Sequence, residues 1–546
     1  MTVFKAVLWL ACGASCLRHV SGHGEPGELY SSIALTRWIF VLDQMLGEFL
    51  ATQTNLTAGS ARYLESYQWA AEDARASNHD MDLTLTGNPL QVYSLFKRLA
   101  LYGSEVVSLQ AHAHAHTYTN HILLHEDGSP VLPSQRDFEG AANGLGRLQR
   151  VYDLPITHLL QGRILNTTCS VKLGVSDCVL VANVSRQNGA LVTAWEWYRQ
   201  ALLLAPENDT IALIKQEMSS LLQELYDEEE EEEEEKEEKE EKEEEKKKKE
   251  KPVQSFLESL PFDIEADEQE RDFNRLCRGE TFLTEQQQRG LQCHVSSMGS
   301  PYLLLRPAKY EQLLRHPELY LYYDVISQNE IEVVQQLSEK ALSRAGLQYV
   351  DGPSELRVAH VAWLANDTHT VLETLSRRIS YMTGLHVHEG EGPDMAGEFL
   401  QVCNYGVGGY FIHHHDPLYK NTPENETFLV TSIKSSIPKL HLFNLRFSPQ
   451  WPEEQLVSGD RLATFVIYLS EVEAGGKTAF PLVGTAVSPV KGGAVFWYNI
   501  HRDGQLDQLA LHGGCPILLG DKWIANKWIH EGPNFQRRLC SLDPDF

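Results

Sequence analysis

A run of 25 acidic residues and lysines, residues 227–251, divides this chain of 546 residues into two parts. The run holds 17 acidic residues and 8 lysines, a net charge of −9, and it contains no apolar side chain. Because such a run has nothing to bury in a core, we interpret it as a low-complexity linker between separately folding parts. The whole chain has a formal net charge of −28, which argues against a nucleic-acid partner.

The first 22 residues have the pattern of a signal peptide. Lys5 precedes an apolar run over residues 6–12, and the small residues of 20–22 fit a cleavage site. The run is too short to anchor the chain in a bilayer, and no similar run recurs, so we expect no membrane span. The chain ends Asp-Pro-Asp-Phe, which is not a retrieval signal of the KDEL type. Six N-x-S/T sequons fit a lumenal or secreted protein: Asn55, Asn166, Asn183, Asn208, Asn366 and Asn425.

Upstream of the linker, apolar residues recur at helical spacing. Ile33, Ile39, Leu42, Leu46 and Leu50 begin this pattern, which predicts helices over 29–143. Such helices pair with a second chain or form a bundle within one chain, and periodicity does not separate the two. A second helical block is predicted over 144–226, where residues 194–208 resemble one helix and the closing turn of a tetratricopeptide (TPR) unit.

Downstream of the linker, the composition changes at about residue 310. Short β-rich runs separated by glycine and proline predict a β-sandwich or barrel, together with a helix over 327–347. The predicted strands are 319–325, 399–405, 463–469, 494–498 and 515–519. The bridge over 252–309 carries Cys277 and Cys293. Outside the signal peptide seven cysteines remain, and the candidate disulfides are the local pairs 169/178, 277/293 and 515/540.

Residues 408–416, Gly-Gly-Tyr-Phe-Ile-His-His-His-Asp, predict a metal site. Along a strand, residues two apart face the same side, so His414 and Asp416 would lie together with their neighbouring histidines on the other face. Two histidines and one carboxylate form the facial triad that holds Fe(II), and His512 is the best candidate for the third ligand. Lys522 would supply a fixed cation for the far carboxylate of a dicarboxylate. The alternative is a solvent-exposed histidine cluster.

The C-terminal third also resembles the catalytic domain of collagen prolyl 4-hydroxylase α subunits. Shorter stretches upstream, residues 139–153 and 276–280 with Cys293, resemble the segments that lead to that domain. The matching catalytic stretches are 400–409, 461–470, 474–480, 493–499 and 520–531.

The resemblance implies an all-α N-terminal half, with a helical dimerisation domain over 23–143 and a truncated TPR-like peptide-binding region over 144–226. It also implies a double-stranded β-helix (jelly roll) over 310–546. By the resemblance His414, Asp416 and His512 bind Fe(II), and Lys522 binds 2-oxoglutarate with the help of Tyr405 and Thr478. Cys277 with Cys293 would form the linker disulfide, and Cys515 with Cys540 remains the other local pair.

The family's reaction couples O₂ and the conversion of 2-oxoglutarate to succinate and CO₂ with hydroxylation of proline at C4. Its substrate is procollagen, in X-Pro-Gly sequences, and ascorbate maintains the iron. Its α subunits assemble with protein disulfide isomerase as an α₂β₂ tetramer in the lumen of the endoplasmic reticulum. The resemblance implies all of these for this chain.

The sequence departs from the family pattern at the mouth of the site. Residues 411–413, Phe-Ile-His, stand where the family has Tyr-Glu-Pro, and the loop between Asp416 and Arg461 is longer than usual. Two alternatives to a procollagen hydroxylase follow: a catalytically weak subunit that acts through its interactions, or a prolyl hydroxylase of a peptide other than collagen.

Overall fold

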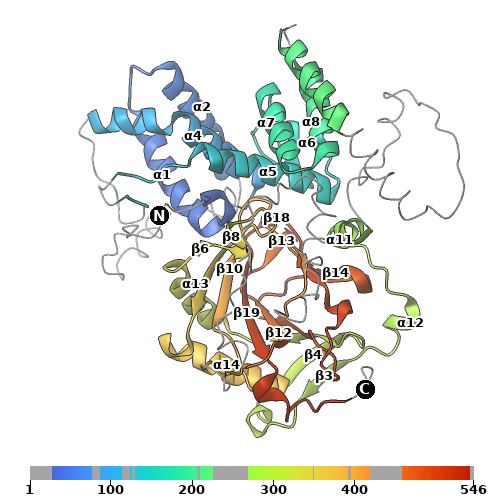
Figure 1. The fold of residues 1–546 in the computed structure, drawn as a ribbon. Coiled ribbons are helices and arrows are strands. Elements are labelled where there is room, and N and C mark those ends of the chain that lie inside the picture. Colours follow the sequence, from blue (N-terminus) through green and yellow to red (C-terminus); the bar gives the residue numbers. More distant parts are fainter. Residues whose placement is uncertain are drawn as a thin grey trace, which may run out of the picture.

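A computed structural model describes most of the chain (Figure 1). The predicted signal peptide, the acidic linker and the sequons at Asn208 and Asn425 lie outside the described residues. The described ranges are 28–76, 87–112, 123–125, 129–205, 209–224, 268–347, 350–390, 395–417 and 458–541.

The part before the linker is helical, as the periodicity predicts. Helix α5 starts at a capping box in which Ser134 and Asp137 bond reciprocally. The helix spans the boundary that the sequence predicts between two domains at 143/144. Residues 209–224 add a further helix, which Arg186 joins to α7 through Glu217 and Glu224. The helices are α1 (Ile33–Ala51), α2 (Ala58–Ala76), α4 (Pro89–His112), α5 (Gln135–Tyr152), α6 (Ile156–Leu160), α7 (Val175–Gln187) and α8 (Leu191–Leu204). Two short strands, β1 (Arg163–Ile164) and β2 (Thr167–Thr168), pair with each other between α6 and α7 in the chain.

The part after the linker is built on two sheets (Figure 1). The larger sheet has the order β3-β4-β5-β16-β12-β19-β10-β9-β6, and the smaller one has the order β11-β17-β14-β15. The strands of the larger sheet are β3 (Cys293–Ser296), β4 (Ala308–Leu314), β5 (Leu319–Tyr323), β6 (Ser343–Arg344), β9 (His360–Leu364), β10 (Leu400–Asn404), β12 (Arg461–Tyr468), β16 (Ala494–Tyr498) and β19 (Trp523–His530). Those of the smaller sheet are β11 (Phe411–His414), β14 (Thr478–Phe480), β15 (Thr485–Val487) and β17 (His512–Gly514), and the pairs β13 (Val472–Gly475) with β18 (Ile517–Gly520) and β7 (Gly346–Leu347) with β8 (Val350–Pro353) complete the strands.

Buried side chains fill the space between the two sheets. One cluster joins Tyr468 and Trp497 of the larger sheet to Phe480 and Val487 of the smaller one. A second cluster covers the other face of the larger sheet, where α13 (Gln328–Glu339) and α14 (Thr370–Thr383) pack. The part is therefore a β-sandwich with helices on its outer side, consistent with the jelly roll of 2-oxoglutarate oxygenases.

Two boundaries in this part differ from the sequence prediction. The helix predicted over 327–347 ends at Glu339, because the chain then turns into the edge strand β6. The sheet also begins upstream of residue 310, since β3 lies in the predicted linker and pairs with β4. The five predicted strands each overlap an observed one, and they cover β5, β10 and β16 over their full lengths.

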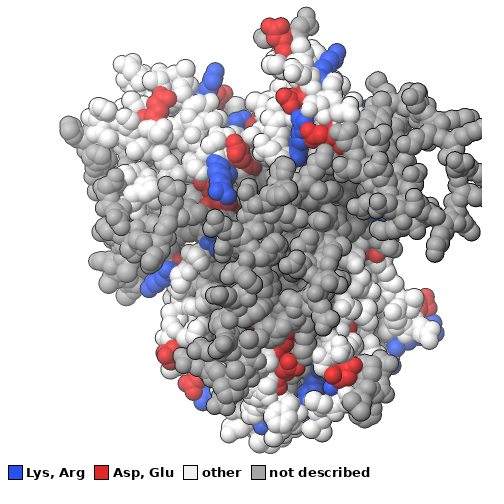
Figure 2. All heavy atoms as spheres, in the orientation of Figure 1, with Lys and Arg blue, Asp and Glu red and all other residues white. Residues whose placement is uncertain are grey.

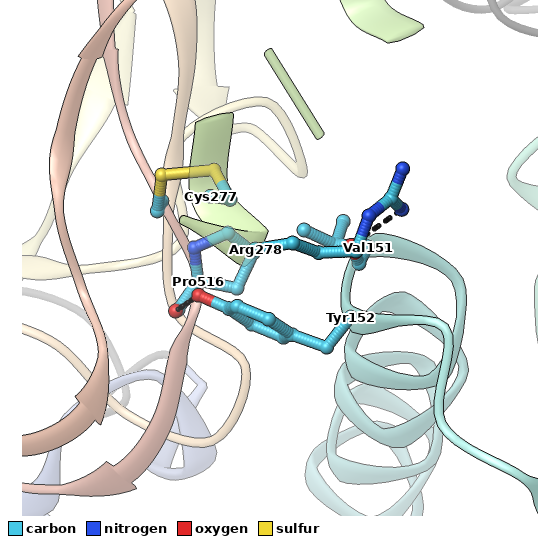
Figure 3. The surroundings of a disulfide bond; sticks show 6 residues. Val151, Tyr152, Cys277, Arg278 and Pro516 are labelled. Atoms are coloured by element: carbon cyan, nitrogen blue, oxygen red, sulfur yellow. Dashed lines mark hydrogen bonds between the residues drawn. A yellow bond between two sulfur atoms is a disulfide. The ribbon is translucent and has the colours of Figure 1, made fainter. Parts of the chain in front are cut away.

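The predicted disulfide pairs are wrong. Cys277 bonds to Cys515, 238 residues away, while Cys169, Cys178, Cys293 and Cys540 are free thiols. The reason is that α11 (Glu268–Arg278) packs against the smaller sheet and brings Cys277 to the loop between β17 and β18, whereas Cys293 is exposed on an edge strand. The end of α5 joins the same junction, where the Tyr152 hydroxyl donates to the Pro516 carbonyl at 2.5 Å and Arg278 donates to the Val151 carbonyl (Figure 3).

The described sequons fall into two groups. Asn55 and Asn166 are exposed. Asn183 and Asn366 are half-buried, and their side-chain oxygens accept hydrogen bonds from Tyr198 and Ser376.

In the described ranges every helix is too short or too polar to cross a bilayer. On the face shown in Figure 2, acidic and basic side chains are interspersed.

Candidate active site

The pairing of β11 with β17 brings two histidines together. His414 and His512 are register partners in this antiparallel pair, and their ring centroids are 4.5 Å apart. Asp416 follows two residues after His414, and its carboxylate oxygens lie 3.6 Å from the Nε2 atom of each histidine. All three candidate ligand atoms are within 4.8 Å of one another. The structure thus assembles the three predicted residues, although His512 is 96 residues further along the chain than Asp416.

The backbone fixes the orientation of both imidazoles. The Nδ1 atom of His414 donates to the Ile412 carbonyl at 2.7 Å, and that of His512 donates to the Ala510 carbonyl at 3.0 Å. A proton on Nδ1 leaves the Nε2 lone pair of each ring directed at the site, the arrangement found in most histidine metal ligands. Burial also lowers the pKa of His512 to about 4, so its ring is neutral, as metal ligation requires.

A chain of hydrogen bonds holds the carboxylate of Asp416. Thr464 on β12 donates to Asp416 Oδ2 at 2.6 Å, and the Asn499 amide donates to the Thr464 hydroxyl at 2.9 Å. Arg461 donates to the Asp416 backbone carbonyl at 3.3 Å and is itself bound by Glu398. Sequence reasoning missed these residues, because a threonine or asparagine within an apolar strand carries no motif. The alternation along β12 would have placed Thr464 on the cavity face only once that face was known.

Lys522 shares a cavity with the three residues. The cavity is bounded by His414, Asp416, His512 and Lys522, and by the aromatic rings of Phe411 and Trp497 among others. Lys522 is 2% exposed, and in the described part of the chain no carboxylate forms an ion pair with it. Burial lowers its pKa to about 7. A buried cation without a carboxylate partner is costly, and it fits a site that receives an anion.

Tyr405 and Thr478 line the same cavity, as the resemblance implies. The ammonium group of Lys522 lies 5.1 Å from the centre of the Tyr405 ring. The hydroxyl of Thr478 is 2.9 Å from that of Tyr468, which lies on β12 in the larger sheet opposite. Both residues therefore border the cavity that also holds Lys522 and the two histidines.

The neighbouring histidines point elsewhere, as strand alternation predicts. His413 is buried on the opposite side of β11, where its ring lies 5.9 Å from that of Phe273 on α11. The Nε2 atom of His415 is 3.1 Å from the Gln508 carbonyl. Phe411, which stands at the first position of the altered family motif, stacks on His414 with ring centroids 3.7 Å apart.

The donor set fits a divalent iron ion. One carboxylate and two imidazoles at the β11–β17 pair supply three ligands on one side, and the cavity that reaches Lys522 lies on the other. A dicarboxylate that reached from the metal to Lys522 would cross a cavity bounded by apolar and aromatic side chains as well as by Tyr405 and Thr478.

Comparisons with known proteins find matches to both the helical part and the sheet-rich part of the chain. Residues 42–166 match the model of the prolyl 4-hydroxylase α-subunit N-terminal region, and residues 400–530 match that of the 2OG-Fe(II) oxygenase superfamily. The bovine prolyl 4-hydroxylase subunit alpha-3 is 32% identical over 96% of each chain, and the human subunit alpha-1 is 29% identical over 84% of this chain and 85% of its own. A solved viral collagen prolyl hydroxylase from Paramecium bursaria Chlorella virus-1 is 23% identical, covering 39% of this chain and 95% of its own, with a TM-score of 0.27. Similarity along nearly the whole length, with a histidine–aspartate–histidine cluster inside the oxygenase region, means that this chain belongs to the prolyl 4-hydroxylase α-subunit family.

Proposed function

We propose that this chain is the catalytic α subunit of a procollagen prolyl 4-hydroxylase, acting at C4 of proline in X-Pro-Gly sequences. The observation that carries the proposal is that the His414–Asp416–His512 cluster opens into the same cavity as the buried Lys522. Fe(II) requires the three ligands of the cluster, and the distal carboxylate of 2-oxoglutarate requires a cation, which Lys522 would supply. A subunit that kept only its fold for interactions would have no need of a buried cation that finds no carboxylate partner among the described residues.

In this proposal His414, Asp416 and His512 would hold Fe(II), and the bound ion would supply the activation of O₂ that couples conversion of 2-oxoglutarate to succinate and CO₂ with proline hydroxylation. Thr464 keeps one Asp416 oxygen hydrogen-bonded, so the carboxylate presents its other oxygen to the metal. The two backbone carbonyls on the imidazole Nδ1 atoms prevent either ring from rotating. The protein thus sets the coordination geometry before the metal arrives.

Lys522, Tyr405 and Thr478 bind the far end of the cosubstrate. Binding of a carboxylate beside Lys522 favours the charged ammonium, so the pKa of Lys522 rises again when the site fills. Trp497, Val466 and Ile524 line the cavity with apolar surface, and a site that excludes water strengthens the ion pair.

We extend the same proposal to the helical part of the chain, to its partner subunit and to its sequons. Residues 23–143 would form the dimerisation domain, and the helices of residues 144–226 would form a TPR-like region that binds proline-rich peptides. Protein disulfide isomerase would be the β subunit of an α₂β₂ tetramer in the lumen of the endoplasmic reticulum, and ascorbate would maintain the iron. Of the six sequons, Asn55 and Asn166 are the better glycosylation candidates because they are exposed.

The test is a reconstituted reaction. The full-length chain is co-expressed with a protein disulfide isomerase and incubated with Fe(II), 2-oxoglutarate, ascorbate and a (Pro-Pro-Gly)-type peptide, and 4-hydroxyproline is identified by mass spectrometry. We expect hydroxyproline and succinate in equal amounts, both absent from an Asp416→Ala complex. Succinate release without peptide hydroxylation would indicate a substrate other than collagen, and iron binding without succinate would indicate an interaction subunit.

A further inference from the structure

The start of the helical half lies against the strand ends that carry the proposed cosubstrate site. Residues 32–37, here called the N-terminal arm, form the cap and first turn of α1. The arm contacts the end of β10 at Asn404 and Tyr405 and the segment before β19 at Asp521. The first of these segments contains Tyr405, and the second directly precedes Lys522. Because Tyr405 and Lys522 both line the cavity, the arm lies behind the wall that these two residues form.

Asn404 joins the arm to the Lys522 segment. Its side-chain oxygen accepts from the Ser32 hydroxyl at 2.7 Å and from the Ala34 amide at 2.9 Å. Its side-chain nitrogen donates to Asp521 Oδ1 at 3.0 Å and to the Lys522 carbonyl at 3.4 Å. Asn404 is completely buried, and two acceptor and two donor contacts use the whole hydrogen-bonding capacity of its amide.

Lys522 needs this support because it lies beyond the regular ladder. The pairing of β10 with β19 ends at Asn404 and Trp523, so among the described residues the Lys522 backbone has the Tyr405 amide, at 3.2 Å, as its main-chain partner, and the Ser470 hydroxyl bonds to the backbone of Asp521 and Trp523 on either side. Beyond the last paired residues of β10 and β19, the N-terminal arm supplies further contacts. The Ile33 amide donates to the Tyr405 carbonyl at 3.3 Å, and Arg37 pairs with Asp521 at 3.2 Å.

We propose that the N-terminal arm positions Lys522 and thereby sets the affinity of the chain for 2-oxoglutarate, so that the helical half is part of the cosubstrate site. This inference rests on the proposed function of Lys522. Ser32, Arg37 and Asn404 are positioning residues in this scheme, because they act through the Lys522 backbone and do not line the cavity. A change in how the helical half sits on the sandwich would then change cosubstrate affinity without altering the metal ligands.

The experiment compares three interface variants with one control in the full-length chain co-expressed with protein disulfide isomerase. Asn404→Ala removes the junction, Arg37→Ala removes the outer ion pair, and Arg37→Lys keeps the charge. Glu355→Ala is the control, because Glu355 also joins the two halves, through the Tyr30 hydroxyl at 2.8 Å and Arg147 at 3.2 Å, but it does not contact the Lys522 segment. The dissociation constant of 2-oxoglutarate is measured by anaerobic calorimetry with Fe(II) present, alongside bound iron, thermal unfolding, and KM and kcat.

We expect Asn404→Ala to raise the dissociation constant of 2-oxoglutarate and its KM by about tenfold or more, since a small misplacement of a binding group has effects of this size. Arg37→Ala should raise them several-fold and Arg37→Lys should largely restore them, while bound iron and kcat at saturating 2-oxoglutarate stay near wild type. Glu355→Ala should leave the dissociation constant unchanged even if it lowers the unfolding temperature.

Two results would overturn the inference alone: wild-type 2-oxoglutarate affinity in Arg37→Ala, or an equal loss of affinity in Glu355→Ala. Arg37→Ala decides the matter if Asn404→Ala does not fold. If the wild-type complex binds no 2-oxoglutarate, the proposed function itself fails, and the inference fails with it.

Discussion

Replacing Lys522 by methionine should stabilise the free protein while it strongly weakens cosubstrate binding. Burial lowers the pKa of this lysine from 10.5 to about 7, and a difference of about 3.5 pH units corresponds to about 5 kcal/mol against the charged form. Methionine has a similar length and no charge to bury. We therefore expect Lys522→Met to raise the free energy of unfolding by a few kcal/mol at pH 7, with about 4 kcal/mol as the ceiling.

The stability difference between Lys522→Met and wild type should depend on pH, because folding lowers the pKa of Lys522. A lysine whose pKa is lowered on folding destabilises the protein most when it is charged in both states, which holds below pH 7. As the pH rises from 7 towards 10.5, the unfolded chain still binds the proton that the folded protein has lost, so wild type gains stability. The advantage of Lys522→Met should shrink from about 5 kcal/mol at pH 6 to about 2 kcal/mol at pH 9. Urea unfolding at the two pH values measures it.

Lys527 on the same part of the chain provides the matched control. It is equally buried, but its ammonium group bonds to Glu389 at 2.9 Å and to the Glu398 carbonyl. Lys527→Met should therefore destabilise the protein by about 3–5 kcal/mol, because it leaves a buried carboxylate without its partner. Removing the Lys522 partner of a bound carboxylate should weaken 2-oxoglutarate binding by a similar free energy, at least about a hundredfold. A Lys522→Met protein that is less stable than wild type and keeps its KM for 2-oxoglutarate would refute this reasoning.

Three further predictions concern the metal site and its frame. His414→Ala should abolish Fe(II) binding and turnover, whereas His413→Ala, on the other face of β11, should keep bound iron; equal loss in metal analysis would contradict the strand register. Thr464→Val should lower iron affinity about 10–100-fold, measured by competition with a chelator, because it frees an Asp416 oxygen from its hydrogen bond. Replacing Cys277 by serine should lower stability by up to about 4–5 kcal/mol in denaturant unfolding, since the bond closes a loop of 238 residues; a non-reduced peptide map that links Cys277 to Cys293 instead would contradict the fold.

Local patterns in the sequence determined much of this protein. Helical periodicity located the helices before residue 227, and short β-rich runs located the central strands of the sandwich, because amphipathic period and turn residues act within a few positions. The two-residue spacing placed His414 beside Asp416 by the same local rule. His512 and Lys522 were predicted as well, because Lys522 follows His512 by ten residues and both positions match the pattern of the family that the chain resembles.

Contacts between distant parts of the chain were decided only by the tertiary structure. Proximity in sequence predicted Cys277 with Cys293, but the packing of α11 on the smaller sheet brought Cys277 to Cys515. The hydrogen bond of Thr464 to Asp416 and the junction of Asn404 with the N-terminal arm likewise join residues 48 and 372 positions apart. Such partners leave no periodic signal, because a buried hydrogen bond specifies the chemistry of its two ends and not the length of chain that joins them.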